Sequence, residues 1–345
     1  MTAGSSESGA AEMDDIGSPG RSLRRGALLG GGLWVACAGY CAITACEDRL
    51  ELIELLLLFG PLLAVPGGLS MVVGQQAPGE LRGEGPVVRL LLPAALCVVV
   101  SRWLAPGLPA AALAAPWLLV TGLVALLGLQ RIIRRGFFPL AELTVDEGLL
   151  YLPVGGGWLL LSSAGLEPMG FDSTIVLLTA VHFHFAGFSA ALVAGLAGRV
   201  LKGDASVTDN VRSLALGAYR LAAAIVILGP PLVAVGIMAS PIVEVISGIA
   251  LSIGMLTLAF VLVLIALAVE RLLPKLLLCI AALSLTATMA LSMTYAAGEY
   301  RGEELVSIAT MAATHGVANV LGFTFCGGLG LIVLLRETGD SRADG

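Results

Sequence analysis

Three histidines are the residues of this chain whose type and placement most directly predict chemistry. His182 and His184 lie in one long apolar run, and His315 lies in another. An imidazole is costly in hydrocarbon unless it faces a polar interior, so an ionisable group inside a membrane segment is a candidate functional residue. The histidines therefore predict a shared polar centre inside a membrane protein. The alternative is three separate core histidines, each hydrogen-bonded to a neighbour.

A pair of carboxyl groups gives the second chemical signal. Glu142 and Asp146 are four residues apart, which places them on one face of a helix. Two buried carboxyls that lie close together share a proton, so one of them can act as an acid near neutral pH. The alternative places both acids in the headgroup layer. We expect the catalytic residues to be His182, His184, His315, Asp146 and Glu142.

Aromatic side chains near the histidines are suited to hold a lipophilic or cationic molecule against their ring faces. Asn319 follows His315 by four residues and shares its helix face. Residues two apart on an α-helix point about 200° away from each other, so we expect only one of His182 and His184 to face the cavity. The expected substrate-binding residues are Phe183, Phe185, Phe188, Trp158, Tyr151 and Asn319.

The composition is that of a membrane protein. The chain is 57% hydrophobic and 13% charged, against about 25% charged residues in an ordinary soluble domain. Apolar segments near the ~20 residues that cross the hydrocarbon core recur about ten times. We therefore expect an all-α, polytopic transmembrane helix bundle of about ten spans in the cell membrane. Its expected parts are a disordered cytoplasmic tail (1–25), a transmembrane helical domain (26–336) and a second cytoplasmic tail (337–345).

The positive charges predict the orientation. If the spans alternate from a cytoplasmic N-terminus, sixteen of the 19 Lys and Arg residues fall on or near the cytoplasmic side. This asymmetry follows the positive-inside rule, so both termini are expected to be cytoplasmic.

The expected partners are the lipid bilayer and a lipophilic small-molecule substrate. The absence of a basic stripe argues against nucleic acid. No HxxxH or ExxH spacing supports a metal site, and no cofactor signature occurs, so neither metal nor cofactor is expected. The pattern leaves the oligomeric state open.

The segment of about 139–165 is expected to contain a broken helix. Pro153 and the run Gly155–Gly157 should interrupt the helix near its middle. Broken helices at membrane depth occur where they are buried in protein or line a cavity. The break near Pro153–Gly157 is therefore expected to bring Asp146 towards the histidines.

Two stretches carry a resemblance to a known family. Tyr151–Trp158 (YLPVGGGW), followed by Leu178–Phe188 with its core HFHFAGF, resembles the YndJ-like family of bacterial membrane proteins. The likeness is clearest over about residues 140–200, with weaker support from Thr314–Asn319. The resemblance implies a polytopic membrane fold and draws attention to these residues. It does not select a reaction.

Two classes of function follow from these patterns. The first is a membrane-embedded enzyme that uses His/Asp acid–base chemistry on a lipophilic substrate. Its most concrete form is proton-initiated cyclisation or isomerisation of an isoprenoid-type (terpenoid) molecule, with aromatic rings stabilising a cation. The alternative is a proton-coupled transporter or permease for a small or lipophilic molecule. In a purely structural membrane protein the clustered histidines would be superfluous.

Overall fold

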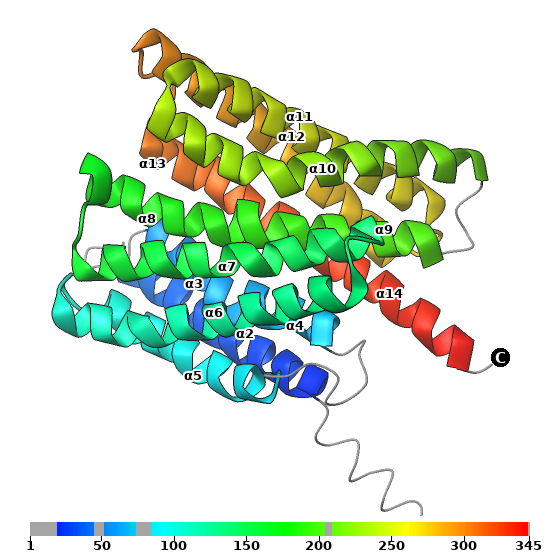
Figure 1. The fold of residues 1–345 in the computed structure, drawn as a ribbon, viewed down its shortest axis with the longest axis horizontal. Helices are drawn as coiled ribbons and strands as arrows, with labels where there is room; N and C mark the ends of the chain where they lie inside the picture. Colours follow the sequence, from blue (N-terminus) through cyan, green and yellow to red (C-terminus); the bar gives the residue numbers. More distant parts are fainter. Residues whose placement is uncertain (1–18, 45–51, 74–83, 204–208, 344–345) are drawn as a thin grey trace, which may run out of the picture.

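The computed structural model describes residues 19–44, 52–73, 84–203 and 209–343. In these residues the helices run back and forth between the two ends of one bundle (Figure 1). Among the described residues, nine helical stretches are long and apolar enough to cross a membrane. The expected all-α polytopic fold is confirmed.

The first half of the chain contains α2 (Pro19–Thr44), α3 (Leu52–Phe59), η1 (Gly60–Ala64), α4 (Val65–Val73), α5 (Glu84–Arg102), α6 (Leu108–Arg135) and α7 (Leu140–Ala164). The second half contains η2 (Pro168–Gly170), α8 (Ser173–His182), η3 (Phe183–Ser189), α9 (Ala190–Gly203), α10 (Asp209–Ala239), α11 (Pro241–Ala268), α12 (Leu272–Arg301), α13 (Ile308–Met311), η4 (Ala312–Gly316), η5 (Ala318–Gly327) and α14 (Gly328–Ala343).

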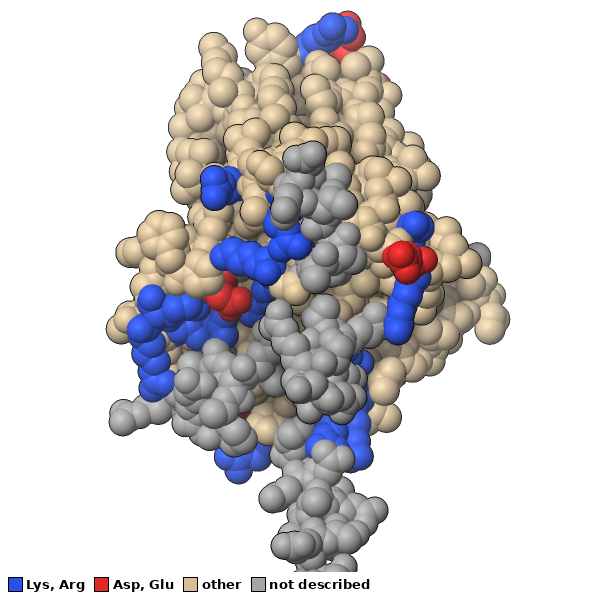
Figure 2. All heavy atoms as spheres, turned by 90° about the vertical axis from the view of Figure 1, so that its right-hand side faces the viewer, with Lys and Arg blue, Asp and Glu red and all other residues tan. Residues whose placement is uncertain are grey.

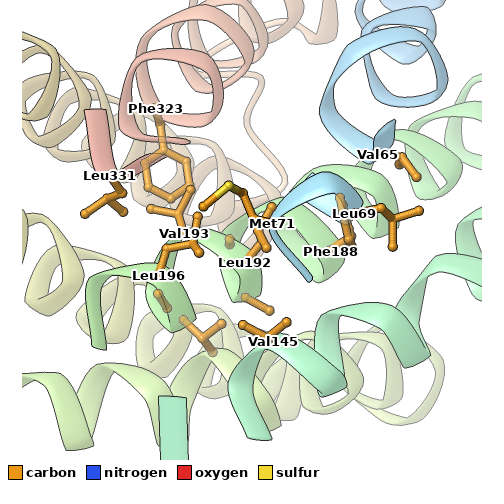
Figure 3. Close-up of a cluster of buried hydrophobic side chains, with 14 of the residues drawn as sticks. Val65, Leu69, Met71, Val145, Phe188, Leu192, Val193, Leu196, Phe323 and Leu331 are labelled. Atoms are coloured by element: carbon orange, nitrogen blue, oxygen red, sulfur yellow. The ribbon is translucent and has the colours of Figure 1, made fainter. Parts of the chain in front are cut away.

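Helix α9 lies at the centre of the bundle. Its residues from Ala190 to Gly198 are all buried, as expected for a helix that is apolar on every side. Figure 3 shows how α4, α7 and the last stretch of the chain surround it, with Met71, Val145 and Phe323 directed towards its leucines and valine. This core fixes the positions of η3 and η5, which carry or adjoin the histidines.

Three of the membrane-crossing stretches contain π-helical turns: η1 in the second, η3 in the stretch that begins with α8, and η4 and η5 in the last. In η1, Pro61 has no N–H to donate to the preceding turn, which favours a local change of helical register. Segment η3 contacts both η1 and η5. Such turns occur frequently at functional sites.

The expected break in α7 is wrong, because the helix is continuous from Leu140 to Ala164 with Pro153 inside it. Its glycines instead allow neighbouring helices to approach closely. A Cβ atom on Gly155 would lie 2.7 Å from Nδ1 of His184, and one on Gly156 would lie 2.6 Å from Oγ1 of Thr121. The glycine run therefore serves packing rather than a cavity-lining break.

Helices extend into both of the expected tails. Helix α2 begins at Pro19 and α14 extends to Ala343, so residues 19–25 and 337–343 are helical. A proline is compatible with the first turn of a helix, where its missing N–H is not needed. The rest of the predicted tails, 1–18 and 344–345, lies outside the described residues.

Lysine and arginine gather at one end of the bundle. Figure 2 looks onto this end, where blue side chains outnumber red ones. Arg134 and Arg135 lie in the last turn of α6, and Lys202 lies in the last turn of α9. The described helix ends therefore reproduce the charge asymmetry that the sequence predicts.

Candidate functional site

His184 is a fully buried core residue, with 0% of its surface exposed. Its Nδ1 lies 2.8 Å from the carbonyl oxygen of Ala180, one turn earlier in the helix. The carbonyl can only accept, so Nδ1 carries the proton and Nε2 accepts from Nε1 of Trp117 at 3.0 Å. Both ring nitrogens are therefore engaged, and the imidazole is neutral.

The surroundings of His184 confirm this packing role. The Trp117 ring is stacked with the imidazole at a centroid distance of 6.0 Å. A Cβ atom on Gly60 would meet the ring at 3.2 Å, and Gly155 touches it from α7. His184 thus joins η1, α6 and α7 at one point, and no open nitrogen is left for acid–base work.

His315 is half-buried and belongs to a polar network on η4, η5 and α12. Its Nδ1 donates to the carbonyl oxygen of Thr288 at 3.0 Å, and its Nε2 accepts from Nδ2 of Asn319 at 3.0 Å. The amide oxygen of Asn319 accepts in turn from Oγ1 of Thr288 at 3.1 Å. This closed loop fixes the ring orientation and the tautomer of His315.

His182 differs from the other two histidines because it keeps one ring nitrogen open. Its Nδ1 donates to the carbonyl oxygen of Leu178 at 2.7 Å. Its Nε2 has no hydrogen-bond partner in the described part of the chain. The side chain of His182 is exposed. The exposed ring and the open nitrogen set His182 apart from His184 and His315.

The last helical stretch of the chain lies near His182. His182 and His315 are close enough to interact electrostatically. Helix α8 and segment η4 both pack against α3. Thr310, Ala313 and Thr314 are exposed on α13 and η4 at the end where α8 begins (Figure 1). The histidine of the HFH motif that lies near His315 is His182. The shared polar cavity expected around the pair stays a prediction.

The predicted acids occupy a different place. Asp146 is 0% exposed and binds Nε of Arg131 and, at 2.6 Å, NH2 of Arg135. Glu142 binds NH2 of Arg131 at 2.6 Å and Nε and NH2 of Arg199 at 2.6 and 2.7 Å. Each of the two carboxyls thus contacts guanidinium groups, and no hydrogen bond between the two carboxyls is seen in the described residues. We call these five residues the arginine–carboxylate network.

The network joins helices at the Lys/Arg-rich end of the bundle. Arg131 and Arg135 come from α6, the two acids from the start of α7, and Arg199 from α9. Arg199 also donates to the carbonyl oxygen of Met71 on α4 at 3.2 Å. Four stretches are thereby held together, which is a structural role.

The predicted substrate-binding residues lie in different surroundings. Phe183 is half-buried beside Tyr151, and Phe185 is buried beside Phe59. Phe188 is 1% exposed in the central core, and Trp158 lies against Phe171 near the end of α7. Asn319 binds His315. The structure brings Asn319 to His315 and places Phe188 in the core.

Three features of the site were not expected from the sequence. Trp117 binds His184, Thr288 holds His315, and Glu147 on α7 stays apart from the arginines that bind its neighbours. The pairing of acids with arginines had a signal in the sequence. Arg131 and Arg135 are four apart, as are Glu142 and Asp146, with a short turn at residues 136–139 between the pairs.

The sequence matches a known protein family over most of its length. The profile of the YndJ-like protein family matches residues 55–323, which include all three histidines and the whole arginine–carboxylate network. The chain belongs to the YndJ-like family. The resemblance inferred from the HFHFAGF core is thereby confirmed.

A protein of Bacillus subtilis (strain 168), described as an uncharacterized membrane protein YndJ, is 32% identical over 207 residues. The aligned part covers 60% of this chain and 35% of the Bacillus protein, so this YndJ-like chain corresponds to about a third of that relative. No solved structure matches the chain. This YndJ-like protein is accordingly a multi-pass membrane protein.

Proposed function

We propose that this YndJ-like protein is a membrane-embedded enzyme in which His182 performs acid–base chemistry on a lipophilic substrate. The observation that carries the proposal is the open Nε2 of His182, whose exposed ring lies near His315. A neutral imidazole with one open nitrogen can take a proton from a substrate and return it at another atom. The donation from Nδ1 to Leu178 fixes the tautomer that leaves Nε2 as the base.

The arrangement favours isomerisation over cyclisation. Cyclisation begins when a strong acid protonates an alkene or epoxide, and the expected acids, Asp146 and Glu142, are bound by arginines. A histidine is suited to move a proton between two carbons next to an activating group. Phe183 lies at the adjacent position, which suits a lipophilic, isoprenoid-type substrate. We therefore infer isomerisation of such a molecule as the reaction.

Access from the outer side fits this proposal. Ser307, Thr310 and Thr314 follow one another along one side of α13 and η4, leading from the α12–α13 connection towards His315. This connection lies at the end opposite to the Lys/Arg-rich one (Figure 1). The positive-inside rule assigns the Lys/Arg-rich end, with both termini, to the cytoplasm. Cys41, near the other end of α2, forms a disulfide, which supports an oxidising outer side.

Proton-coupled transport is the second candidate, and one observation favours it. The π-helical segments η1, η3, η4 and η5 lie in three neighbouring stretches around His182 and His315. Local register changes of this kind allow a helix to switch between two arrangements. In a transporter, the same histidine would bind and release a proton without altering the substrate.

Loss of turnover after His182→Ala replacement is the expected result that tests the proposal. Lipid extracts of a deletion strain that carries the wild-type protein are compared with extracts from the same strain carrying the variant. We expect a lipophilic precursor to accumulate and its isomer to fall by about 10²-fold or more, because a general base is lost. Thr294→Ala, an exposed position on α12, is the control and should leave both species unchanged.

Two outcomes would contradict the enzyme proposal. An unchanged lipid profile with His182→Ala would remove His182 from the chemistry. Altered distribution of one unmodified molecule between cells and medium would favour transport.

A further inference from the structure

The turn between α6 and α7 places arginines beside exposed aromatic rings. Arg134 and Arg135 end α6, and Phe137 and Phe138 follow within three residues. Phe137 is 66% exposed and Phe138 is 80% exposed. Rings as exposed as these add nothing to the core of the bundle, so they are available to a binding partner.

The length of α6 places this turn at the membrane surface. The helix has 28 residues and is therefore about 42 Å long at a rise of ~1.5 Å per residue. The hydrocarbon core of a bilayer is ~30 Å thick, so a helix centred on it extends about 6 Å beyond it at each end. The turn thus lies in the headgroup layer, where aromatic side chains meet headgroups on one side and acyl chains on the other.

An apolar stripe on α6 leads to the turn. Its members are exposed and follow one another at intervals of seven, three and four residues, which places them on one face of the helix; they are Leu119, Leu126, Leu129 and Ile133. In the described ranges α6 packs chiefly against α5 and α7, so this face is turned towards lipid. An acyl chain that lies along the stripe brings its headgroup to the turn.

Arg135 is held in place with one nitrogen left open. Its Nε donates to the carbonyl oxygen of Phe138 at 3.2 Å, and its NH2 donates to a carboxyl oxygen of Asp146 at 2.6 Å. Its NH1 makes no hydrogen bond in the part of the chain that the structure describes. The side chain is 24% exposed. A guanidinium fixed at two nitrogens and open at the third is suited to bind an oxyanion, because it loses little conformational freedom on binding.

The charge balance around Arg135 favours an anion. The arginine–carboxylate network contains three guanidinium groups and two carboxyls, so it keeps at least one positive charge. Positive charge beside apolar rings in the headgroup layer is complementary to a phospholipid with a net negative charge. A zwitterionic phospholipid brings a phosphate but no net charge, so it gains less from the same surroundings.

We propose that the α6–α7 turn is a binding site for an anionic phospholipid. NH1 of Arg135 binds the phosphate, and Phe137, Phe138 and Ile133 contact the upper part of the acyl chains. The site belongs to the Lys/Arg-rich end of the bundle (Figure 2) and does not rest on the chemistry proposed for His182. Because Arg135 also binds Asp146, a bound lipid stabilises the junction of α6 and α7.

Native mass spectrometry of the full chain, titrated in detergent with dioleoyl phosphatidylglycerol or dioleoyl phosphatidylcholine, tests the site. Wild-type protein should retain more of the anionic lipid. Arg135→Gln should weaken binding of phosphatidylglycerol about 5-fold, the effect of one basic side chain at an anionic lipid, while Asp146 stays bound to Arg131. Arg301→Gln, which replaces an exposed arginine in the last turn of α12, is the matched control and should leave binding unchanged. Equal retention of the two lipids, or the same result for both arginine variants, overturns the proposal.

A measurement on wild-type protein keeps the test valid if Arg135→Gln fails to fold. The full chain is reconstituted in phosphatidylcholine vesicles that contain a phosphatidylglycerol with a photoreactive group near the top of one acyl chain. After illumination, peptide mass spectrometry should place the adducts mainly on residues 133–138. Adducts spread evenly over the lipid-facing helices would overturn the proposal. Competition by inorganic phosphate alone would also overturn it, because the site would then bind a free anion.

Discussion

Replacing Asp146 by Ala is expected to leave little folded protein in the membrane. Asp146 is fully buried and neutralises Arg131 and Arg135, which belong to a network of three arginines and two carboxylates. Removal of one partner from a buried ion pair leaves an uncompensated charge and costs about 3–5 kcal/mol. The readouts are abundance in membranes and the thermal unfolding midpoint in detergent.

A second replacement separates this structural role from catalysis. Asp146→Asn combined with Arg135→Gln removes one charge of each sign, so it should recover part of the stability lost in Asp146→Asn alone. A catalytic acid would behave differently, since its single replacement would leave abundance normal and abolish turnover. That pattern would restore the role that the sequence first suggested for Asp146.

His184→Ala is the replacement with the second largest expected effect. It deletes a fully buried ring in contact with Gly60 and Gly155, and it leaves the indole N–H of Trp117 without an acceptor. A large-to-small change in a core costs about 2–5 kcal/mol, and an unsatisfied buried donor adds about 1–3 kcal/mol. We expect loss of thermal stability in detergent and reduced abundance.

His182→Ala provides the matched control, two residues earlier on the same helix. Its ring is exposed, so its removal should change stability by no more than about 0.5 kcal/mol. Comparable destabilisation by the two replacements would mean that His182 is also a packing residue. Normal stability of His184→Ala would mean that the contact with Trp117 contributes little.

The arrangement of the histidines was partly predictable from the sequence. Alternating spans and a constant rise per residue predict a similar depth for His182 and His315, and the two are close enough to interact in the structure. The same reasoning gave opposite directions for His182 and His184, and in the structure His182 is exposed whereas His184 is buried. Which of the two histidines is buried depends on Trp117 and Gly155. These residues come from other helices, so the sequence around the histidines carries no signal of them.

The binding partners of Glu142 and Asp146 were less predictable from the sequence. The spacing of Glu142 and Asp146 gives a shared helix face, but it does not say what that face meets. The arginines of α6 meet it because α6 and α7 form a tight helical hairpin. The run Gly155–Gly157 is compatible with two structures: a break in its own helix, or a close approach of neighbouring helices. The close approach prevails because His184 and Thr121 fill the space beside Gly155 and Gly156.

Chemical modification of the three histidines tests the central claim most directly. Diethyl pyrocarbonate acylates a neutral imidazole through an open ring nitrogen, and mass spectrometry locates the adduct. In native membranes, His182 should be modified, whereas His184 and His315 should stay unmodified because both of their nitrogens are hydrogen-bonded. Modification of His184 or His315 before His182 would contradict the assignment of His182 as the reacting group.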